Sequence, residues 1–257
     1  MKICILGTGH MGAWLVEELC HDHEVGIFDK DPKKMKYFFN VKRFHKLEEI
    51  KDFAPELLIN AVDLRHTVQA FEEVMDFIPE KCMLSDVTSV KSGIADYYKN
   101  NGRRFVSTHP MFGPTFANIR ELENENAIII KESDEKGKKF FHDLYSSLNL
   151  NIFEYSFDEH DATTAYSLGT PFTSSMVFAA CLKNQEAPGT TFRKHMEIAE
   201  GLLSEDDYLL TEIMFNPYVL EQIKKINSQL SYLTHIIECK DTEVMTDFLN
   251  RLRKNIE

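Results

Sequence analysis

This sequence lacks long apolar runs. No stretch approaches the roughly 18 consecutive apolar residues that a membrane-spanning helix needs. The first residues, "MKICILGTGHMG", are apolar only briefly before the glycines begin, without a basic leader or a small-residue cleavage site. We therefore expect a cytoplasmic protein that has no membrane segment.

Cysteine and positive charge are also scarce. The five cysteines are scattered singly, with no C-x-x-C pair, which fits neither a disulfide framework nor a structural zinc site. We expect reduced thiols and no metal centre. A formal net charge of -12 argues against a broad phosphate-binding surface, because nucleic acids are gripped by clustered Lys and Arg. A small anionic substrate stays possible through a focused site.

The first part of the chain alternates short apolar runs with longer mixed segments, which is typical of strands and helices in alternation. Near-continuous apolar strands favour a parallel sheet that is covered by helices on both faces. We therefore predict an α/β fold with a Rossmann-type, mostly parallel sheet as a dinucleotide-binding domain at residues 1–157. The expected strands span residues 2–6, 24–29, 57–62, 82–87, 103–109, 126–131 and 151–156, with a further short strand at 41–44.

Residues 158–257 have a different pattern, in which the strand-like runs stop. Apolar residues recur at helical spacing in "PYVLEQIKKINSQLSYLTHIIE", namely Val219, Leu220, Ile223, Ile226, Leu230, Leu233, Ile236 and Ile237. We expect an all-α domain that binds substrate and forms a homodimer, because an exposed apolar stripe usually finds a partner.

Turn and capping signals divide this helical half. Asn216 before Pro217 predicts a helix start, and Ser204 and Asp241 are expected N-caps. Pro171 should kink or break the segment rich in small residues around it.

The stretch "KICILGTGHMGAWLVEEL" reads as a strand, a Gly-x-Gly-x-x-Gly loop and a helix. Gly7 permits the tight turn, Gly9 lets the backbone approach a pyrophosphate, and Gly12 allows close packing of helix on strand. Asp29 ends the second strand, where a carboxylate accepts hydrogen bonds from ribose hydroxyls and repels a 2′-phosphate. NAD is thus favoured over NADP, although the lysines that follow could soften this preference. The expected cofactor-binding residues are Gly7, Gly9, His10, Met11, Gly12, Asp29 and Val62.

Polar residues follow several predicted strands, at the edge where ligands bind in an open parallel sheet. Ser89 follows the fourth major strand, and His109 ends the next, between Ser107 and two prolines, Pro110 and Pro114, that should stiffen its loop. A neutral imidazole suits the acceptance of a hydroxyl proton near neutral pH. We predict His109 as catalytic, with Ser89 orienting the imidazole or the substrate; Ser89 could instead cap the following helix.

The segments "SDVTSVKSGI", "STHPMFGP" and "DEHDATTAY" resemble those of prephenate dehydrogenases, the enzymes of tyrosine biosynthesis. This resemblance implies NAD-dependent oxidative decarboxylation of prephenate: hydride leaves C4, C1 loses its carboxylate as carbon dioxide, and 4-hydroxyphenylpyruvate forms. It also implies that His109 accepts the proton of the 4-hydroxyl, with Ser89 as its helper. His160 and Asp161 match the family's His-Asp and are expected to organise the start of the helical domain.

Two positions depart from the family pattern. Gly201 stands where the family's substrate-binding arginine would fall, and Phe172 stands where it has a further histidine. A dianionic substrate still needs a cation, since unpaired buried carboxylates are costly. We predict Arg193 in this substrate-binding role beside Ser89 and His109; Lys194, His195 and Arg65 are alternatives.

Other functions fit the same residues. Arogenate carries an amine where prephenate has a keto group, and the sequence does not exclude it. The chain could also be another NAD(P)-dependent hydroxyacid or imine oxidoreductase, although those enzymes usually depend on a lysine or aspartate of the helical domain. The third alternative is a non-catalytic NAD-binding dimer.

Overall fold

The structure, a computed structural model, describes residues 1–112, 122, 125–183 and 186–257. One sheet of eight strands has the order β3-β2-β1-β4-β5-β6-β7-β8. Every neighbouring pair is parallel except β6 and β7. This arrangement confirms the predicted α/β fold. The strands are β1 (Lys2–Leu6), β2 (Glu24–Phe28), β3 (Lys42–Phe44), β4 (Leu57–Asn60), β5 (Met83–Asp86), β6 (Phe105–Pro110), β7 (Asn126–Ile130) and β8 (Asn151–Tyr155).

Helices cover both faces of this sheet, as its two-sided apolar strands require. Alternate residues of β1 face opposite ways: Ile3 and Ile5 join the core under two helices, whereas Cys4 and Leu6 join the core under three others. The first pair of helices is α1 (His10–Leu19) and α5 (Glu135–Ser147), and the other group is α2 (Glu49–Phe53), α3 (Thr67–Val74) and α4 (Ile94–Asn101). Short 3₁₀ turns at Pro32–Met35, Leu64–His66 and Met75–Phe77 complete the connections.

Strand β6 extends past its predicted end. Pro110 is the last strand residue and pairs with Ala127 of β7, while His109 pairs with Ile128. His109 therefore lies within a strand, and Pro110 is not part of a loop as the sequence suggested, because pairing with β7 extends the strand. Pro114, the second proline of the motif, lies outside the described residues.

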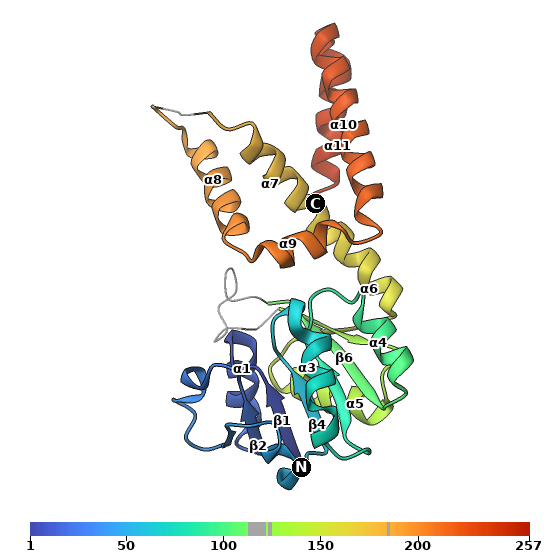
Figure 1. Cartoon of the computed structure of the whole chain (residues 1–257). Helices are drawn as coiled ribbons and strands as arrows, with labels where there is room; N and C mark the ends of the chain where they lie inside the picture. Colours follow the sequence, from blue (N-terminus) through green and yellow to red (C-terminus); the bar gives the residue numbers. More distant parts are fainter. Residues whose placement is uncertain (113–121, 123–124, 184–185) are drawn as a thin grey trace.

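From Phe157 onward the described residues form helices and their connections. Figure 1 shows this helical half standing above the sheet, with α6 rising from the α/β domain and with α10 and α11 projecting furthest from it. The boundary at 157 stays a prediction, although β8 ends at Tyr155 and α6 begins at Phe157. The helices are α6 (Phe157–Thr164), α7 (Thr170–Ala180), α8 (Thr190–Leu203), α9 (Asp207–Met214), α10 (Val219–Cys239) and α11 (Thr242–Lys254).

The helix boundaries confirm some of the predicted caps and correct others. Asp241 caps α11 through a hydrogen bond from the backbone N–H of Val244. Ser204 instead follows the end of α8, and Asp206 caps α9, since its carboxylate accepts from two backbone N–H groups. Helix α10 begins at Val219, not at Pro217, and Asn216 Oδ1 accepts from the N–H of Tyr218 in the turn that precedes the helix.

The backbone stays helical from Phe157 to Ala180, so Pro171 does not break the segment around it as the sequence suggested it might. A single π-helical turn, Ala165–Gly169, separates α6 from α7, and Pro171 lies in the first turn of α7. Gly169 makes the close helix approach expected of this small-residue segment, because a Cβ there would lie 2.7 Å from Cγ2 of Val219. This turn is therefore the place where the start of α10 packs closely against the segment.

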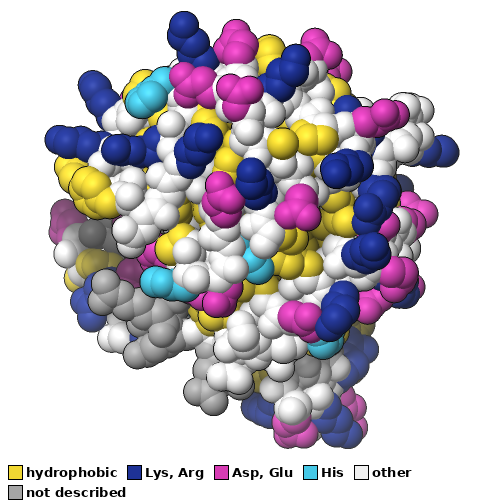
Figure 2. All heavy atoms as spheres, turned by 90° about the horizontal axis from the view of Figure 1, so that it is seen from below, with side chains coloured by type: hydrophobic (Ala, Val, Ile, Leu, Met, Phe, Trp, Pro, Cys, Tyr) yellow, Lys and Arg dark blue, Asp and Glu magenta, His cyan; other side chains and the backbone are white. Residues whose placement is uncertain are grey.

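On the face seen from below, acidic and basic side chains are interspersed (Figure 2). None of the helices in the described part of the chain is both long and apolar enough to cross a bilayer.

Candidate active site

A cavity of about 610 Å³ lies at the carboxyl ends of β1, β2 and β4. The sheet reverses its order between β1 and β4, which is the place where open α/β sheets bind ligands. All seven expected cofactor residues belong to this region, and six of them line the cavity: Gly7, Gly9, His10, Met11, Asp29 and Val62. Gly12 lies behind the loop, in the first turn of α1.

The glycines of the loop have different structural roles. Gly7 has φ +83°, a left-handed conformation that favours glycine, and a Cβ on it would lie 2.9 Å from the backbone of Ala61. A Cβ on Gly12 would lie 2.0 Å from the carbonyl oxygen of Gly7, so the helix can approach the turn only without a side chain. At Gly9 a Cβ would meet nothing within 4 Å. That side of the loop therefore offers its backbone to a ligand.

The start of α1 is suited to a phosphate group. Gly9 is its N-cap and provides no side-chain acceptor for the first-turn N–H groups. Free amides and the positive end of the helix dipole together favour an anion.

Asp29 joins the end of β2 to the glycine loop. Its Oδ2 accepts hydrogen bonds from the backbone N–H and the hydroxyl of Thr8, at 2.8 and 3.1 Å, and its Oδ1 accepts from the N–H of Asp31 at 2.8 Å. These bonds fix the carboxylate at the wall of the cavity. Thr8 was not singled out in the sequence, since threonine inside the loop has no distinguishing pattern.

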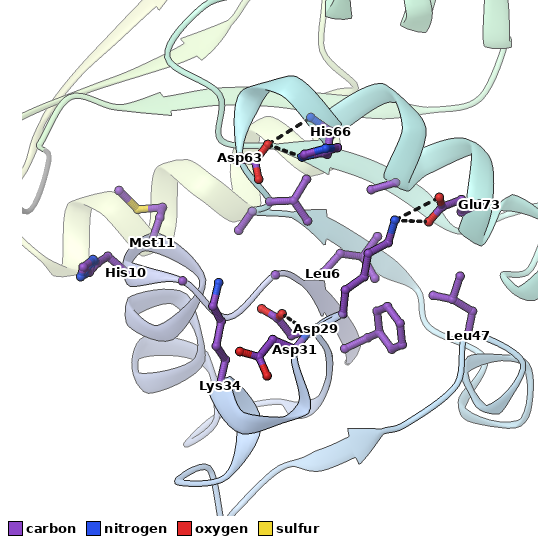
Figure 3. A pocket seen from close by; sticks show the side chains of 17 residues that line it. Leu6, His10, Met11, Asp29, Asp31, Lys34, Leu47, Asp63, His66 and Glu73 are labelled. Atoms are coloured by element: carbon purple, nitrogen blue, oxygen red, sulfur yellow. Dashed lines mark hydrogen bonds and ion pairs between the residues drawn. The ribbon is translucent and has the colours of Figure 1, made fainter. Parts of the chain in front are cut away.

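Two further pairs line the same cavity (Figure 3). The ammonium group of Lys30 lies 3.0 Å from Oε2 of Glu73, and Nδ1 of His66 lies 2.6 Å from Oδ1 of Asp63. Lys34 lines the cavity close to Asp29 and Asp31, so this end of the cavity combines acidic and basic groups. The glycine loop, the uncapped helix start and the fixed carboxylate fit a dinucleotide.

His109 lies further along the same edge of the sheet, almost fully buried at 6% exposure. Its Nδ1 is 3.0 Å from Nε2 of His160. His160 belongs to α6 and lies 51 positions after His109 in the sequence. Burial lowers the pKa of His109 well below its ordinary value, and His160 and the Lys91 ammonium act in the same direction. The imidazole is therefore neutral at neutral pH and can accept a proton.

A buried ion pair connects strand β5 to the strand that carries His109. The Lys91 ammonium contacts Oδ1 of Asp86 at 2.7 Å and also donates to the carbonyl oxygen of Thr108 at 2.7 Å. Tyr98 donates its hydroxyl to the other oxygen of Asp86. Burial would raise the pKa of Asp86, but Lys91 and neighbouring hydroxyl groups hold it below its ordinary value. The strand before His109 is thus tied to β5 by a charged contact.

The other predicted site residues are more dispersed. Ser89 is half-buried in the loop after β5, and among the described residues it is His160, not Ser89, that is hydrogen-bonded to the His109 ring. Arg193 is exposed on α8, where its guanidinium group donates to the Pro188 carbonyl oxygen and the Thr190 hydroxyl. It lines a separate cavity of about 560 Å³ within the helical half. The roles of Ser89 and Arg193 stay predictions.

Arg65 lies between the two halves of the chain. Its guanidinium group stacks 4.8 Å from the ring centroid of Tyr208 on α9. Both residues line a cavity of about 340 Å³, together with Thr88, Ser92 and Glu212. Of the arginines that the sequence proposed for the substrate, Arg65 is the one that stands at the carboxyl edge of the sheet, in the turn after β4.

Comparisons with known proteins agree with this architecture. The chain is similar to a crystal structure of prephenate dehydrogenase from A. aeolicus in complex with hydroxyphenyl propionate and NAD+, with a TM-score of 0.84 and 17% identity over 100% of this chain and 98% of that one. It is also similar to Synechocystis arogenate dehydrogenase, with a TM-score of 0.79 and 16% identity over 99% and 98% of the two chains. At these identities the likeness concerns the fold.

The sequence comparisons agree with the structural ones. A probable arogenate/prephenate dehydrogenase of Methanocaldococcus jannaschii is 24% identical over 215 residues, which are 78% of this chain. The chain spans about half, 48%, of the length of that relative. Residues 16–151 match the family model for the nucleotide-binding domain of prephenate dehydrogenase, more than half of the chain. The protein therefore contains this nucleotide-binding domain and belongs to the prephenate dehydrogenase family.

Proposed function

We propose that this protein catalyses the NAD-dependent oxidative decarboxylation of prephenate to 4-hydroxyphenylpyruvate, in tyrosine biosynthesis. The observation that carries the proposal is the buried, neutral His109 on the same sheet edge as the dinucleotide cavity. Arogenate is the alternative substrate, since similar structures include enzymes named for each compound.

The cofactor site of this chain supports NAD. The pyrophosphate would meet the glycine loop and the start of α1, and the ribose would meet the Asp29 carboxylate, whose charge disfavours a 2′-phosphate. When bound, NAD accepts the hydride that leaves C4 of the substrate. The lysines beside Asp29, of which Lys30 is already paired with Glu73, are the groups that would weaken the preference for NAD.

His109 has the central chemical role in this proposal. As the C4–H bond breaks, the imidazole accepts the proton of the 4-hydroxyl group, and the electron pair of the C1–carboxylate bond moves into the ring as carbon dioxide leaves. The ring oxygen then takes a proton back as the phenol. Burial of the imidazole keeps it neutral and thus competent to accept the proton.

The carboxylates of the substrate need a cation. The sequence predicts Arg193 for this role, but the position of Arg65 in the turn after β4, beside Tyr208 of α9, favours Arg65. Arginine suits the role because its planar guanidinium group binds a carboxylate in bidentate fashion.

The proposal is tested by mixing the purified protein with NAD and either prephenate or arogenate and following NADH absorbance. We expect turnover of prephenate that falls by roughly 100-fold or more in His109→Asn, the lower range for loss of a positioned proton acceptor. Turnover of arogenate alone would assign the alternative substrate. Binding of NAD without turnover of either compound would favour a non-catalytic NAD-binding dimer.

A further inference from the structure

Three side chains form a hydrogen-bonded chain that leads away from the reacting histidine. Nδ1 of His109 lies 3.0 Å from Nε2 of His160, and Nδ1 of His160 lies 3.0 Å from Oδ1 of Asp161. The His160 side chain is fully buried, and that of Asp161 is 13% exposed. Water therefore has little access to these two hydrogen bonds, and the three side chains pair with one another instead.

The direction of the hydrogen bonds in this series follows from Asp161, its last member. A carboxylate only accepts hydrogen bonds, so Nδ1 of His160 carries a proton and donates it to Asp161. In a neutral His160 the Nε2 atom is then bare and accepts, so Nδ1 of His109 must carry the proton between the rings. Nε2 of His109 then carries no proton and keeps its lone pair. These hydrogen bonds thus select the tautomer of His109 that can take a proton at Nε2.

Asp161 is held in place from two directions. Its Oδ1 also accepts from the backbone N–H of Lys91 at 3.4 Å, in the loop after β5. Its backbone carbonyl accepts from the side-chain amide of Asn216 at 2.9 Å, just before α10. The carboxylate is therefore fixed where the α/β domain meets the helical domain.

The surrounding charges make His160 the better place for a positive charge. The charged groups around the two rings, within the described residues, are the Lys91 ammonium, the Asp86 carboxylate that pairs with it, and Asp161. Lys91 repels a positive charge on either ring, whereas, of the two rings, the Asp161 carboxylate contacts that of His160. A proton that arrives at Nε2 of His109 is thus stabilised if the Nδ1 proton moves on to His160.

We propose that His160 and Asp161 act as a proton relay behind His109, an inference that rests on the proposed function. As the substrate hydroxyl gives its proton to Nε2 of His109, the Nδ1 proton passes to Nε2 of His160, which becomes an imidazolium beside the Asp161 carboxylate. When the ring oxygen has become a phenolate, both transfers reverse and the phenol forms, so the protein ends with the protons it began with. His160 and Asp161 are positioning residues, because His109 alone contacts the substrate.

Two variants test the relay in the full chain. In His160→Gln, the amide oxygen reaches the position of Nε2 and can still accept from His109, but it cannot take up a proton. In Asp161→Asn, the charge beside His160 is lost. For each we expect kcat to fall on the order of 100-fold while the NAD affinity is kept. In Asp161→Asn we also expect the acidic limb of the kcat profile to move to lower pH, because the negative charge that favours the imidazolium is lost. Asp158→Asn, on the exposed face of the same helix, is the matched control and should leave both unchanged.

Each outcome decides the question. An unchanged kcat and profile in both variants would show that His109 works alone. A lower kcat without movement of the acidic limb in Asp161→Asn would mean that the two residues only support the structure. Both results overturn the relay.

A measurement without substrate separates this inference from the proposed function. In protein labelled with ¹⁵N at histidine, nitrogen resonances at neutral pH should report a proton on Nδ1 of His109 and a bare Nε2. They should report a proton on Nδ1 of His160. A proton on Nε2 of His109 would overturn the relay even if prephenate is turned over. The expected tautomers in a protein that oxidises neither compound would instead refute the proposed function alone.

Discussion

The ammonium group of Lys91 lies 2.7 Å from Oδ1 of Asp86, and both side chains are fully buried. Removing one member of such a pair leaves an uncompensated charge in the interior. We expect Lys91→Met to lower the free energy of unfolding by about 3–5 kcal/mol, measured by urea denaturation, and the added change Asp86→Asn to restore part of that loss.

A matched control is the exposed pair Lys131 and Glu159, whose charged atoms are 2.6 Å apart. Lys131→Met makes the same chemical change at the surface and should leave stability nearly unchanged, because water screens such pairs. Equal effects of the two substitutions would show that burial of Lys91 does not govern its contribution.

Two substitutions in the glycine loop should separate effects on folding from effects on cofactor binding. Gly12→Ala places a Cβ 2.0 Å from the Gly7 carbonyl oxygen, so we expect a loss of stability of about 1–3 kcal/mol along with weaker NAD binding. Gly9→Ala meets no protein atom within 4 Å and should fold like the natural protein. Its methyl group would still obstruct a bound pyrophosphate. Titration calorimetry that gave wild-type NAD affinity for Gly9→Ala would mean the phosphates lie elsewhere.

The buried histidines should make the protein acid-sensitive. Burial lowers the pKa of both His109 and His160 below the ordinary 6.5, so the unfolded chain takes up these protons before the folded one does. Well above pH 6.5 the two groups are neutral in both states and do not alter stability with pH. As pH falls below 6.5, the free energy of unfolding should decrease by up to about 1.4 kcal/mol per pH unit for each histidine.

Urea denaturation at several pH values checks this slope. The double variant His109→Asn, His160→Gln should show a shallower dependence below pH 6.5, whereas His21→Asn, on the exposed surface, should keep the natural one. A slope that the double variant leaves unaltered would assign the acid sensitivity to other groups.

The residues of this chain differ in how far the sequence could place them. Gly7, Gly12 and Asp29 were predictable because the chemistry of a dinucleotide loop is local: the turn, the helix and the following strand lie within one short segment. The contact of His109 with His160 joins residues that are 51 positions apart and depends on how α6 packs against β6, which no spacing encodes. The only signal for it was the pair of His160 and Asp161 at the start of the helical half.

Local signals also competed with one another. Ser204 and Asp206 are both good capping residues, and the carboxylate of Asp206 caps α9 because α8 continues to Leu203. The position of Arg193 shows a further limit, since spacing along a helix predicts a face but not the neighbour that covers it. Its guanidinium group turns to the chain just before α8.

The two candidate arginines can be told apart by kinetics. Because Arg65 lines the cavity between the turn after β4 and helix α9, we expect Arg65→Ala to raise the KM for the substrate by roughly 10-fold or more, as for a lost charged hydrogen bond, with the NAD affinity kept. Arg193→Ala should then have the smaller effect. The reverse order would support the sequence-based prediction that α8 provides the carboxylate clamp.

The apolar stripe of α10 predicts a homodimer. Leu230 and Ile237 are 55% and 57% exposed and lie two helical turns apart on one face, with Ile223, Ile226 and Leu233 beside them. Such a surface is stabilised when a second copy covers it. We expect light scattering to give a mass twice that of one chain, and Leu230→Glu to yield monomers because a carboxylate would be buried unpaired. Ser228→Glu adds the same charge on the opposite, exposed face of the helix and should stay dimeric. A wild-type protein that is monomeric at every concentration would refute the dimer.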